Sequence, residues 1–198
     1  MSFDFKSVFS QALPYERFLD THATAEEKNR WADFAARVHL SNEQKGLLAG
    51  FRRKMPVICL AGVWCGDCVN ACPIFHVIAQ ATPTIDLRFV HRERNFLSQA
   101  TDLGTRLANE LSICGGPRVP VLVFLSEDFY ECERFGERTL ATYRQKAASR
   151  QGASCNTGLY APSTDIIAAN TAEWLTHFER VQLMLQLSPR LMKLHGEV

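Results

Sequence analysis

Apolar residues at helical spacing dominate the first quarter of the chain. The sequence TAEE at 24–27 has the pattern of a capping box, in which Thr24 and Glu27 satisfy backbone N–H groups at a helix start. The apolar positions that follow, spaced i, i+3, i+4 and i+7, are Trp31, Phe34, Ala35 and Val38. The sequence SNEQ at 41–44 repeats the capping pattern, and its apolar side carries Leu47, Leu48 and Phe51. We expect these helices to pack on a larger core, because short isolated helices are marginal in water.

Between residues 56 and 150 the pattern changes to strands that alternate with helices. Two short, continuous apolar runs predict strands covered on both faces, at 57–63 and 119–125. Two mixed runs predict less buried strands, at 85–90 and 129–135, the second reached by a tight turn around Glu127 and Asp128. Helices are predicted at 65–81, 96–111 and 139–150. This β-α-β-α-β-β-α order predicts an α/β fold with a mixed sheet and helices on both faces.

The last quarter reads as a loop at 151–163 and then one long helix that stops before Pro189. The helix carries a single apolar stripe, formed by Ile167, Thr171, Trp174, Phe178, Val181 and Leu185. We interpret this stripe as a face that docks on the core. The chain is therefore divided into a helical extension (1–55), an α/β core (56–150) and a second helical extension (151–198), all within one compact domain.

Composition and charge exclude several partners. The chain has 198 residues, of which 46% are hydrophobic and 22% charged, and its net charge is +1. Such a balance gives no bias toward nucleic acid or a membrane surface, and we expect neither partner. A local basic stretch runs from Arg134 to Arg150. We interpret it as a solvated helix face.

The N-terminal sequence and the cysteines indicate a cytoplasmic protein. The first 18 residues lack the basic start and apolar run of a signal peptide, and no later run approaches the length of a membrane span. The seven cysteines are an odd number scattered through a chain of ordinary length. They do not resemble a disulfide scaffold.

The stretch AGVWCGDCVNACPIF (61–75) concentrates three cysteines within eight positions. Cys65 and Cys68 fall where a buried strand gives way to a helix, so Cys65 is predicted at a helix N-terminus. Unpaired backbone N–H groups and the helix dipole favour a thiolate at such a position. The two intervening residues keep Cys68 within disulfide reach of Cys65. A CxxC in this context is a redox motif.

These residues resemble the thioredoxin family. The similarity rests on WCGDC (64–68), Pro73, RVP (118–120) and Gly136, and it covers about residues 55 to 150. The resemblance implies a thioredoxin fold, with a cis-proline at Pro120 that faces the disulfide. It also implies that Trp64 packs over the active site.

The resemblance further implies the chemistry and its participants. Cys65 would attack a disulfide of a protein substrate, and Cys68 would then resolve the mixed disulfide. Trp64, Gly66, Asp67 and Pro120 would support the site, and the substrate chain would lie along Arg118, Val119 and Pro120. A reductase of the kind that serves thioredoxins would return the electrons, and no cofactor is expected in the chain itself.

The sequence departs from the family pattern at two positions beside the cysteines. Cys59, six residues before Cys65, replaces the buried aspartate that helps to deprotonate the resolving thiol. Asp67 replaces the proline that usually separates the two cysteines. Its charge is predicted to disfavour the Cys65 thiolate and to make the couple modestly more reducing. Arg118 could offset that charge or attract acidic partners, although a solvated loop arginine is the simpler interpretation.

Three alternatives compete with the redox hypothesis. Cys65, Cys68 and Cys72 match the last three ligands of a C-x2-C-x2-C-x3-C-P iron–sulfur run, but glycine stands at position 62. Cys68, Cys72 and His76 recur every four residues and could bind zinc together with Cys65. The fold could also serve as a non-catalytic interaction module.

The other cysteines have weaker interpretations. Cys72 is more simply a small buried residue, although it could be a third redox thiol, and Cys59 is interpreted as inert core. Cys114 precedes the proposed cis-proline and could approach the site. Cys132 and Cys155 give no functional signal.

Overall fold

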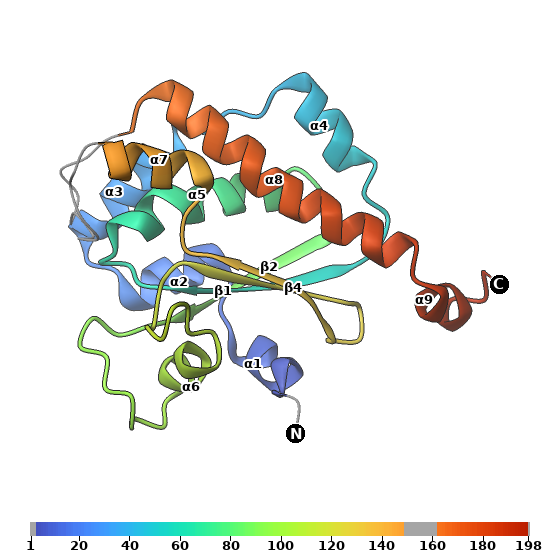
Figure 1. Cartoon of the computed structure of the whole chain (residues 1–198), viewed down its shortest axis with the longest axis horizontal. Coiled ribbons are helices and arrows are strands. Elements are labelled where there is room, and N and C mark those ends of the chain that lie inside the picture. Colours follow the sequence, from blue (N-terminus) through green and yellow to red (C-terminus); the bar gives the residue numbers. More distant parts are fainter. Residues whose placement is uncertain (1–2, 149–161, 198) are drawn as a thin grey trace.

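A computed structural model describes residues 3–148 and 162–197 as a four-stranded sheet with helices on both faces (Figure 1). Four helices precede the sheet, namely α1 (Phe5–Gln11), α2 (Tyr15–His22), α3 (Ala25–Ala35) and α4 (Asn42–Ala49). The central part comprises β1 (Met55–Ala61), α5 (Gly66–Gln80), β2 (Ile85–His91), α6 (Leu103–Glu110), β3 (Val121–Leu125), β4 (Glu131–Gly136) and α7 (Leu140–Ala148). Two further helices follow, α8 (Thr164–Gln186) and α9 (Pro189–Leu194).

The sheet has the strand order β2-β1-β3-β4. Strand β1 runs parallel to β2 and antiparallel to β3, and β4 is antiparallel to β3, so the predicted mixed sheet is confirmed. Every residue of β1 and β3 is buried, as continuous apolar runs require in the centre of a covered sheet. The edge strand β4 is partly exposed, in keeping with its mixed sequence.

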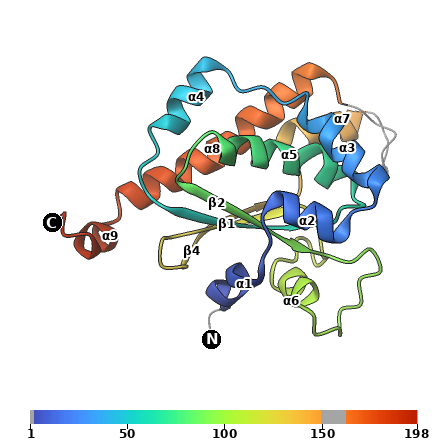
Figure 2. The same cartoon turned by 180° about the vertical axis from the view of Figure 1, so that it is seen from behind.

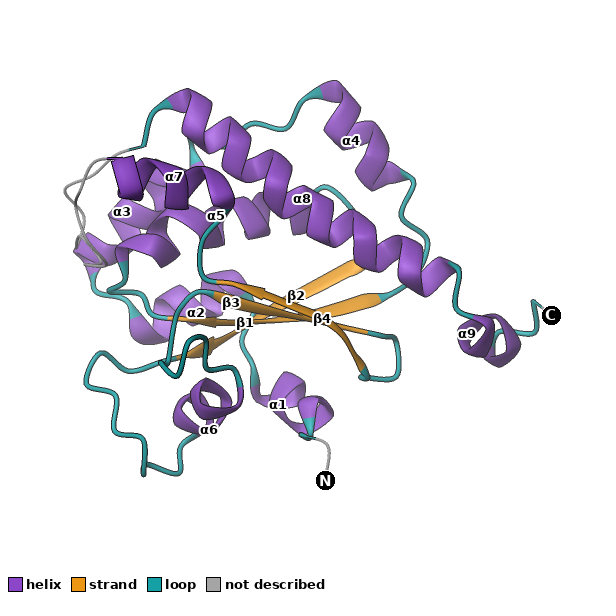
Figure 3. Ribbon diagram, in the orientation of Figure 1, coloured by secondary structure: helices purple, strands orange, loops and turns teal. Residues whose placement is uncertain are grey.

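Helices form a thick layer on one face of the sheet and a thinner one on the other. Helices α5 and α8 lie above the sheet with α3, α4 and α7 around them, while α1 and α6 lie below it (Figure 3). The view from behind shows α2 beside the β2 edge (Figure 2). Leu13, just before α2, exchanges two backbone hydrogen bonds with Phe89 of β2, at 2.9 and 2.7 Å. The N-terminal segment therefore shields part of this sheet edge.

The N-terminal helices begin where the capping patterns predict. Both capping boxes are formed, one by Thr24 with Glu27 and the other by Ser41 with Gln44. Trp31 of α3 is fully buried, and its indole N–H donates to the Val63 carbonyl oxygen at 3.1 Å. This bond connects the N-terminal extension directly to the loop that follows β1.

The long C-terminal helix α8 docks on the core through its predicted stripe. All six predicted stripe residues are buried. Trp174 packs edge-on against Phe75 of α5 and Phe135 of β4, with ring centroids 4.5 and 5.0 Å apart. The docking interpretation of the stripe is therefore confirmed.

A buried glutamine of α8 fastens the backbone that leads into β1. The Gln182 side-chain oxygen accepts from the N–H groups of Arg52 and Arg53, at 3.0 and 2.7 Å. Its amide nitrogen donates to the Arg53 carbonyl oxygen at 3.1 Å. One side chain thus satisfies three backbone groups at the start of the central strand.

Two sequence-based predictions are wrong in detail. The helix predicted at 96–111 is confined to α6, because the Asp102 side chain accepts from Thr105 N–H at 2.9 Å and caps the helix there. The basic stretch is not a solvated helix face at its beginning, since Arg134 lies in β4 and Arg138 is buried. Arg150 and most of the predicted loop 151–163 lie outside the described residues.

Within the described ranges, the structure holds no helix long and apolar enough to cross a membrane.

Candidate active site

Cys65 lies at the point where β1 gives way to α5. Its backbone is extended (φ −86°, ψ 125°) and forms the N-cap of α5, and its carbonyl oxygen accepts from Val69 N–H at 3.0 Å. The prediction of a cysteine at a helix N-terminus is therefore confirmed. Backbone N–H groups of the first turn and the positive end of the helix dipole favour the thiolate form of such a cysteine.

Trp64 lies in the loop between β1 and α5, directly before Cys65. Its indole N–H donates to the Arg92 carbonyl oxygen at 3.1 Å, and the Arg92 guanidinium lies 4.7 Å from the ring centroid. A Cβ atom at position 62 would lie 2.7 Å from the Trp64 ring, so only Gly62 leaves room for this arrangement. Trp64 is thus fixed next to Cys65 by contacts with Arg92 and Gly62.

Cys65 and Cys68 are in the dithiol form and contact each other. The Cys65 thiol also donates to the Val119 carbonyl oxygen at 3.8 Å, and the Cys68 sulfur accepts from Gly62 N–H at 3.4 Å. Cys68 is fully buried, whereas Cys65 is 1% exposed. The pair is therefore arranged with Cys65 toward the loop of Val119 and Cys68 toward the core.

The environment of Cys68 favours its thiolate. Burial alone raises the pKa of Cys68, but hydrogen bonds with the Cys65 and Cys72 side chains and with Gly62 N–H outweigh burial and lower the pKa from 9.0 to about 7. Because Cys65 and Cys68 share a hydrogen bond, the proton that is lost near neutral pH belongs to the pair. These hydrogen bonds therefore bring the titration of the pair close to neutral pH.

A cis-proline faces this pair. The peptide bond between Val119 and Pro120 is cis, as the resemblance predicted, and both residues are buried. A Cβ atom on residue 136 would lie 2.6 Å from the Pro120 carbonyl oxygen, so Gly136 permits β4 to end tightly against this loop. Three of the four segments that carried the resemblance, around Cys65, Pro120 and Gly136, therefore meet in space.

Asp67 is buried and paired with cations. Its side chain is 6% exposed, and Arg138 donates to Oδ2 from Nη2 at 2.6 Å and from Nε at 3.0 Å. Lys146 lies 3.2 Å from Oδ1. Two cations thus lie against the carboxylate whose charge is predicted to disfavour the Cys65 thiolate. Arg118, named as a possible counter-charge, lies 3.9 Å from Glu137.

Sequence reasoning missed Arg138. It lies 71 residues from Asp67 in the chain, so no local spacing relates the two. The available signal was the position of Arg138 two residues after Gly136, where the end of β4 approaches the cis-proline loop.

A family model described as thioredoxin matches residues 13–144 of the chain. The chain belongs to the thioredoxin family. A protein of unknown function from Pseudomonas aeruginosa has the same fold, with a TM-score of 0.66 and 21% identity over 91% of this chain and 99% of that chain. An HIV epitope scaffold is also similar, with a TM-score of 0.58 and 21% identity over 91% of this chain and 94% of that chain. The search of curated proteins found no match.

Two thiols occupy the space under Cys68 in this member of the thioredoxin family. Cys59 takes the position of the aspartate expected from the family, and its sulfur lies 3.9 Å from that of Cys72. Both side chains are fully buried. Burial raises the pKa of Cys72 well above its ordinary value, and hydrogen bonds with Cys59 and Cys68 raise it further. Cys72 therefore stays protonated.

The metal-binding alternatives find no support in the geometry. No three His, Cys, Asp or Glu residues within 3–148 and 162–197 are grouped so that they could hold a metal ion. His76, a proposed zinc ligand, stacks on Tyr15 with ring centroids 3.9 Å apart and lies 3.4 Å from Glu16. Cys114 is exposed in the turn before the cis-proline, and Cys132 is half-buried on β4. Cys155 lies outside the described residues.

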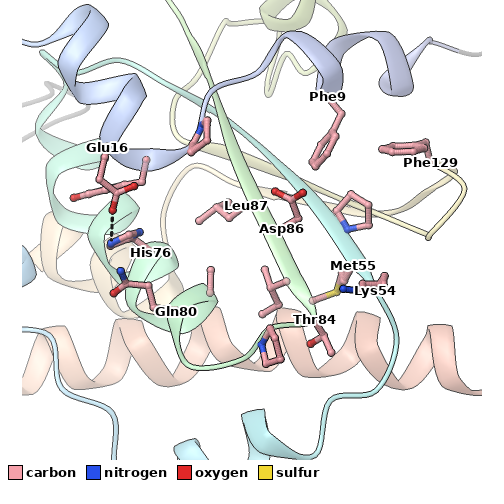
Figure 4. A pocket seen from close by; sticks show the side chains of 16 residues that line it. Phe9, Glu16, Lys54, Met55, His76, Gln80, Thr84, Asp86, Leu87 and Phe129 are labelled. Carbon is pink, nitrogen blue, oxygen red and sulfur yellow. Dashed lines mark ion pairs between the residues drawn. The ribbon is translucent and has the colours of Figure 1, made fainter.

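A cavity of about 530 Å³ opens beside β2, away from the cysteines (Figure 4). The ion pair of His76 with Glu16 closes one side, and Phe9 and Phe129 flank the other. The described residues that line this cavity include no cysteine. It is therefore separate from the redox motif.

Proposed function

We propose that this thioredoxin-family protein is a thiol–disulfide oxidoreductase that reduces protein disulfides through Cys65 and Cys68. One observation carries the proposal: Cys65 caps α5, contacts Cys68, and donates to the carbonyl oxygen of Val119 beside cis-Pro120. A helix N-terminus and a paired thiol with a pKa near neutrality are features that activate a nucleophilic cysteine, and the Val119 carbonyl oxygen marks the backbone beside it.

The reaction consists of two exchanges. The Cys65 thiolate attacks one sulfur of the substrate disulfide, which forms a mixed disulfide and releases the other substrate sulfur as a thiolate. Cys68, as a thiolate, then attacks Cys65 and forms the Cys65–Cys68 disulfide. The second substrate sulfur leaves as a thiolate and takes up a proton. The substrate is reduced by two electrons and the protein is oxidised by two.

The loop of Arg118, Val119 and Pro120 is the proposed substrate-binding segment. The Val119 carbonyl oxygen already accepts from Cys65, so a substrate chain lying along this backbone would bring its disulfide to the nucleophile. A dithiol donor of the thioredoxin-reductase kind would restore Cys65 and Cys68. The cytoplasm is the proposed compartment, since thiols are kept reduced there.

Insulin reduction by dithiothreitol provides the test. We expect the wild-type protein to accelerate precipitation of the insulin B chain and Cys65→Ser to abolish the acceleration. Cys114→Ser is the matched control, because Cys114 is exposed and lies outside the pair. Cys68→Ser should instead accumulate a mixed disulfide at Cys65. A redox potential of about −270 mV for the Cys65–Cys68 couple would indicate a reductase, and one of about −120 mV would indicate an oxidant.

The burial of Cys65 favours a second candidate, a non-catalytic interaction module. With only 1% of its surface exposed, Cys65 requires a local opening before a substrate sulfur can reach it. Equal insulin rates for wild type and Cys65→Ser would support the module.

A further inference from the structure

A buried ion pair joins the CGDC motif to the segment after β4. Asp67 and Arg138 are both 6% exposed in their side chains, and two N–H groups of the guanidinium donate to one carboxylate oxygen. Such charge-assisted contacts are strong and geometrically specific. The proposed exchange gives Arg138 no role in bond making or breaking.

The ion pair belongs to a larger network around the active-site loops. Glu137 accepts from Arg138 Nη1 at 2.5 Å and from the Tyr143 hydroxyl at 3.2 Å. Arg118 of the cis-proline loop lies 3.9 Å from the same Glu137 oxygen. Arg138 therefore lies between the CGDC loop and the acidic residue that faces the substrate-binding loop.

The position of Asp67 places a negative charge close to the cysteine pair. Asp67 lies in the first turn of α5, so its carboxylate and the Cys65–Cys68 thiolate lie at the same positive end of the helix. The Asp67 carboxylate and the thiolate repel each other, and this repulsion is stronger where water is excluded. A cation fixed on Asp67 removes most of that repulsion.

We propose that Arg138 is a positioning residue for thiol–disulfide exchange, which neutralises Asp67 and thereby keeps the Cys65–Cys68 thiolate populated at neutral pH. This inference rests on the proposed redox function. Lys146 contributes to the same balance from α7, but its side chain is 24% exposed, so solvent screens its charge more than that of Arg138.

A double-mutant cycle tests the proposal. The measured quantity is the rate of iodoacetamide alkylation at the cysteine pair against pH, with the labelled residue identified by mass spectrometry. We expect Arg138→Gln to raise the thiolate pKa, so that alkylation at neutral pH slows about fivefold, because a rise of one pKa unit from about 7 lowers the thiolate fraction at pH 7 from about a half to about a tenth. Asp67→Asn should shift the profile in the opposite direction, because it removes a negative charge beside the thiolate and leaves Arg138 with Glu137 as its remaining carboxylate partner. The double variant should lie within about threefold of wild type, since both charges are gone.

Arg134→Gln is the control for the loss of a positive charge from the same stretch. Arg134 pairs with Glu131 at the surface, so we expect the alkylation profile to stay at the wild-type position. Equal shifts in Arg138→Gln and in the double variant would overturn the proposal, as would no shift in Arg138→Gln. If Arg138→Gln does not fold, Asp67→Asn alone decides: a fall in thiolate pKa supports the proposal and a rise overturns it.

The experiment separates this inference from the proposed function. Alkylation measures the thiols without any substrate disulfide. If the variants shift the alkylation profile as expected but the protein does not reduce insulin, the role of Arg138 is supported and the proposed reductase function is rejected.

Discussion

Cys72 of α5 contacts Cys59 of β1, with sulfur atoms 3.9 Å apart, and Cys72 also forms a hydrogen bond with Cys68, the proposed resolving cysteine. A thiol thus occupies position 59, where the sequence departs from the aspartate of the family pattern. Because burial raises the pKa of Cys72, its S–H group remains a hydrogen-bond donor while Cys68 titrates. Cys68 is therefore activated by hydrogen bonds from Cys72 and Gly62 rather than by a base at position 59.

Removal of the Cys72 donor should slow the resolving step. We expect Cys72→Ala to raise the pKa of Cys68 and to reduce resolution at neutral pH by about 2- to 10-fold, the worth of one hydrogen bond. Cys72→Ser should restore much of the rate, since a hydroxyl can donate to the same sulfur. The rate is measured as glutathione release from a Cys65–glutathione mixed disulfide. Equal rates for the alanine and serine variants would contradict the donor role.

The reactivity of the pair should depend on pH around neutrality. Burial raises the pKa of Cys68, yet its hydrogen bonds lower the pKa to about 7. The thiol is therefore mostly protonated below that pH and fully ionised well above it. Alkylation of the reduced protein should therefore accelerate as pH rises through about 7 and then level off. A midpoint near the ordinary thiol value of 9.0 would show that the hydrogen bonds do not act as described.

The C-terminal helix should contribute strongly to stability. Trp174 of α8 is 1% exposed and packs edge-on against two aromatic rings of the core. We expect Trp174→Ala to reduce the free energy of unfolding by about 3–5 kcal/mol, measured by urea denaturation. Leu187→Ala is the control, because Leu187 is 72% exposed and should change stability by less than about 0.5 kcal/mol. A loss below about 1 kcal/mol for Trp174→Ala would mean that the helix is not integral to the core.

A stacked histidine pair should make the protein acid-sensitive. The rings of His22 and His91 lie 4.3 Å apart at an angle of 12°. Burial lowers the pKa of both, and their mutual repulsion lowers that of His22 further, while Glu93 partly opposes the shift of His91. A lowered histidine pKa contributes stability above the unfolded value of 6.5, which is lost as pH falls below it. The urea midpoint should therefore drop between about pH 7.5 and about pH 5.5.

His22→Phe tests the origin of that acid sensitivity. The variant keeps an aromatic ring on His91 and removes one titrating group, so the urea midpoint should depend less steeply on pH. Exposed His39, changed to Phe, is the control and should leave the slope intact. An unchanged slope in His22→Phe would place the acid sensitivity elsewhere.

Local patterns predicted most of the elements, and the family resemblance predicted the redox pair and cis-Pro120. Both signals are short-range, since capping boxes, apolar periods and CxxC are each read within a few residues. The Asp67–Arg138 pair could not be predicted in this way, because it depends on how β4 ends against the cis-proline loop. The prediction of a helix at 96–111 was too long for a local reason. The Asp102 side chain caps the helix, so that α6 begins at Leu103 although the apolar pattern begins earlier.

The three bonds that Gln182 makes to Arg52 and Arg53 have a consequence for biosynthesis. The residue that fixes the backbone leading into β1 lies about 130 positions downstream of it. A ribosome delivers β1 long before α8 leaves the exit tunnel, so the amides of Arg52 and Arg53 must first be bound by water. The central strand therefore receives its final anchor only after α8 has been translated, and a chain that terminates before α8 emerges with its redox motif but without that anchor.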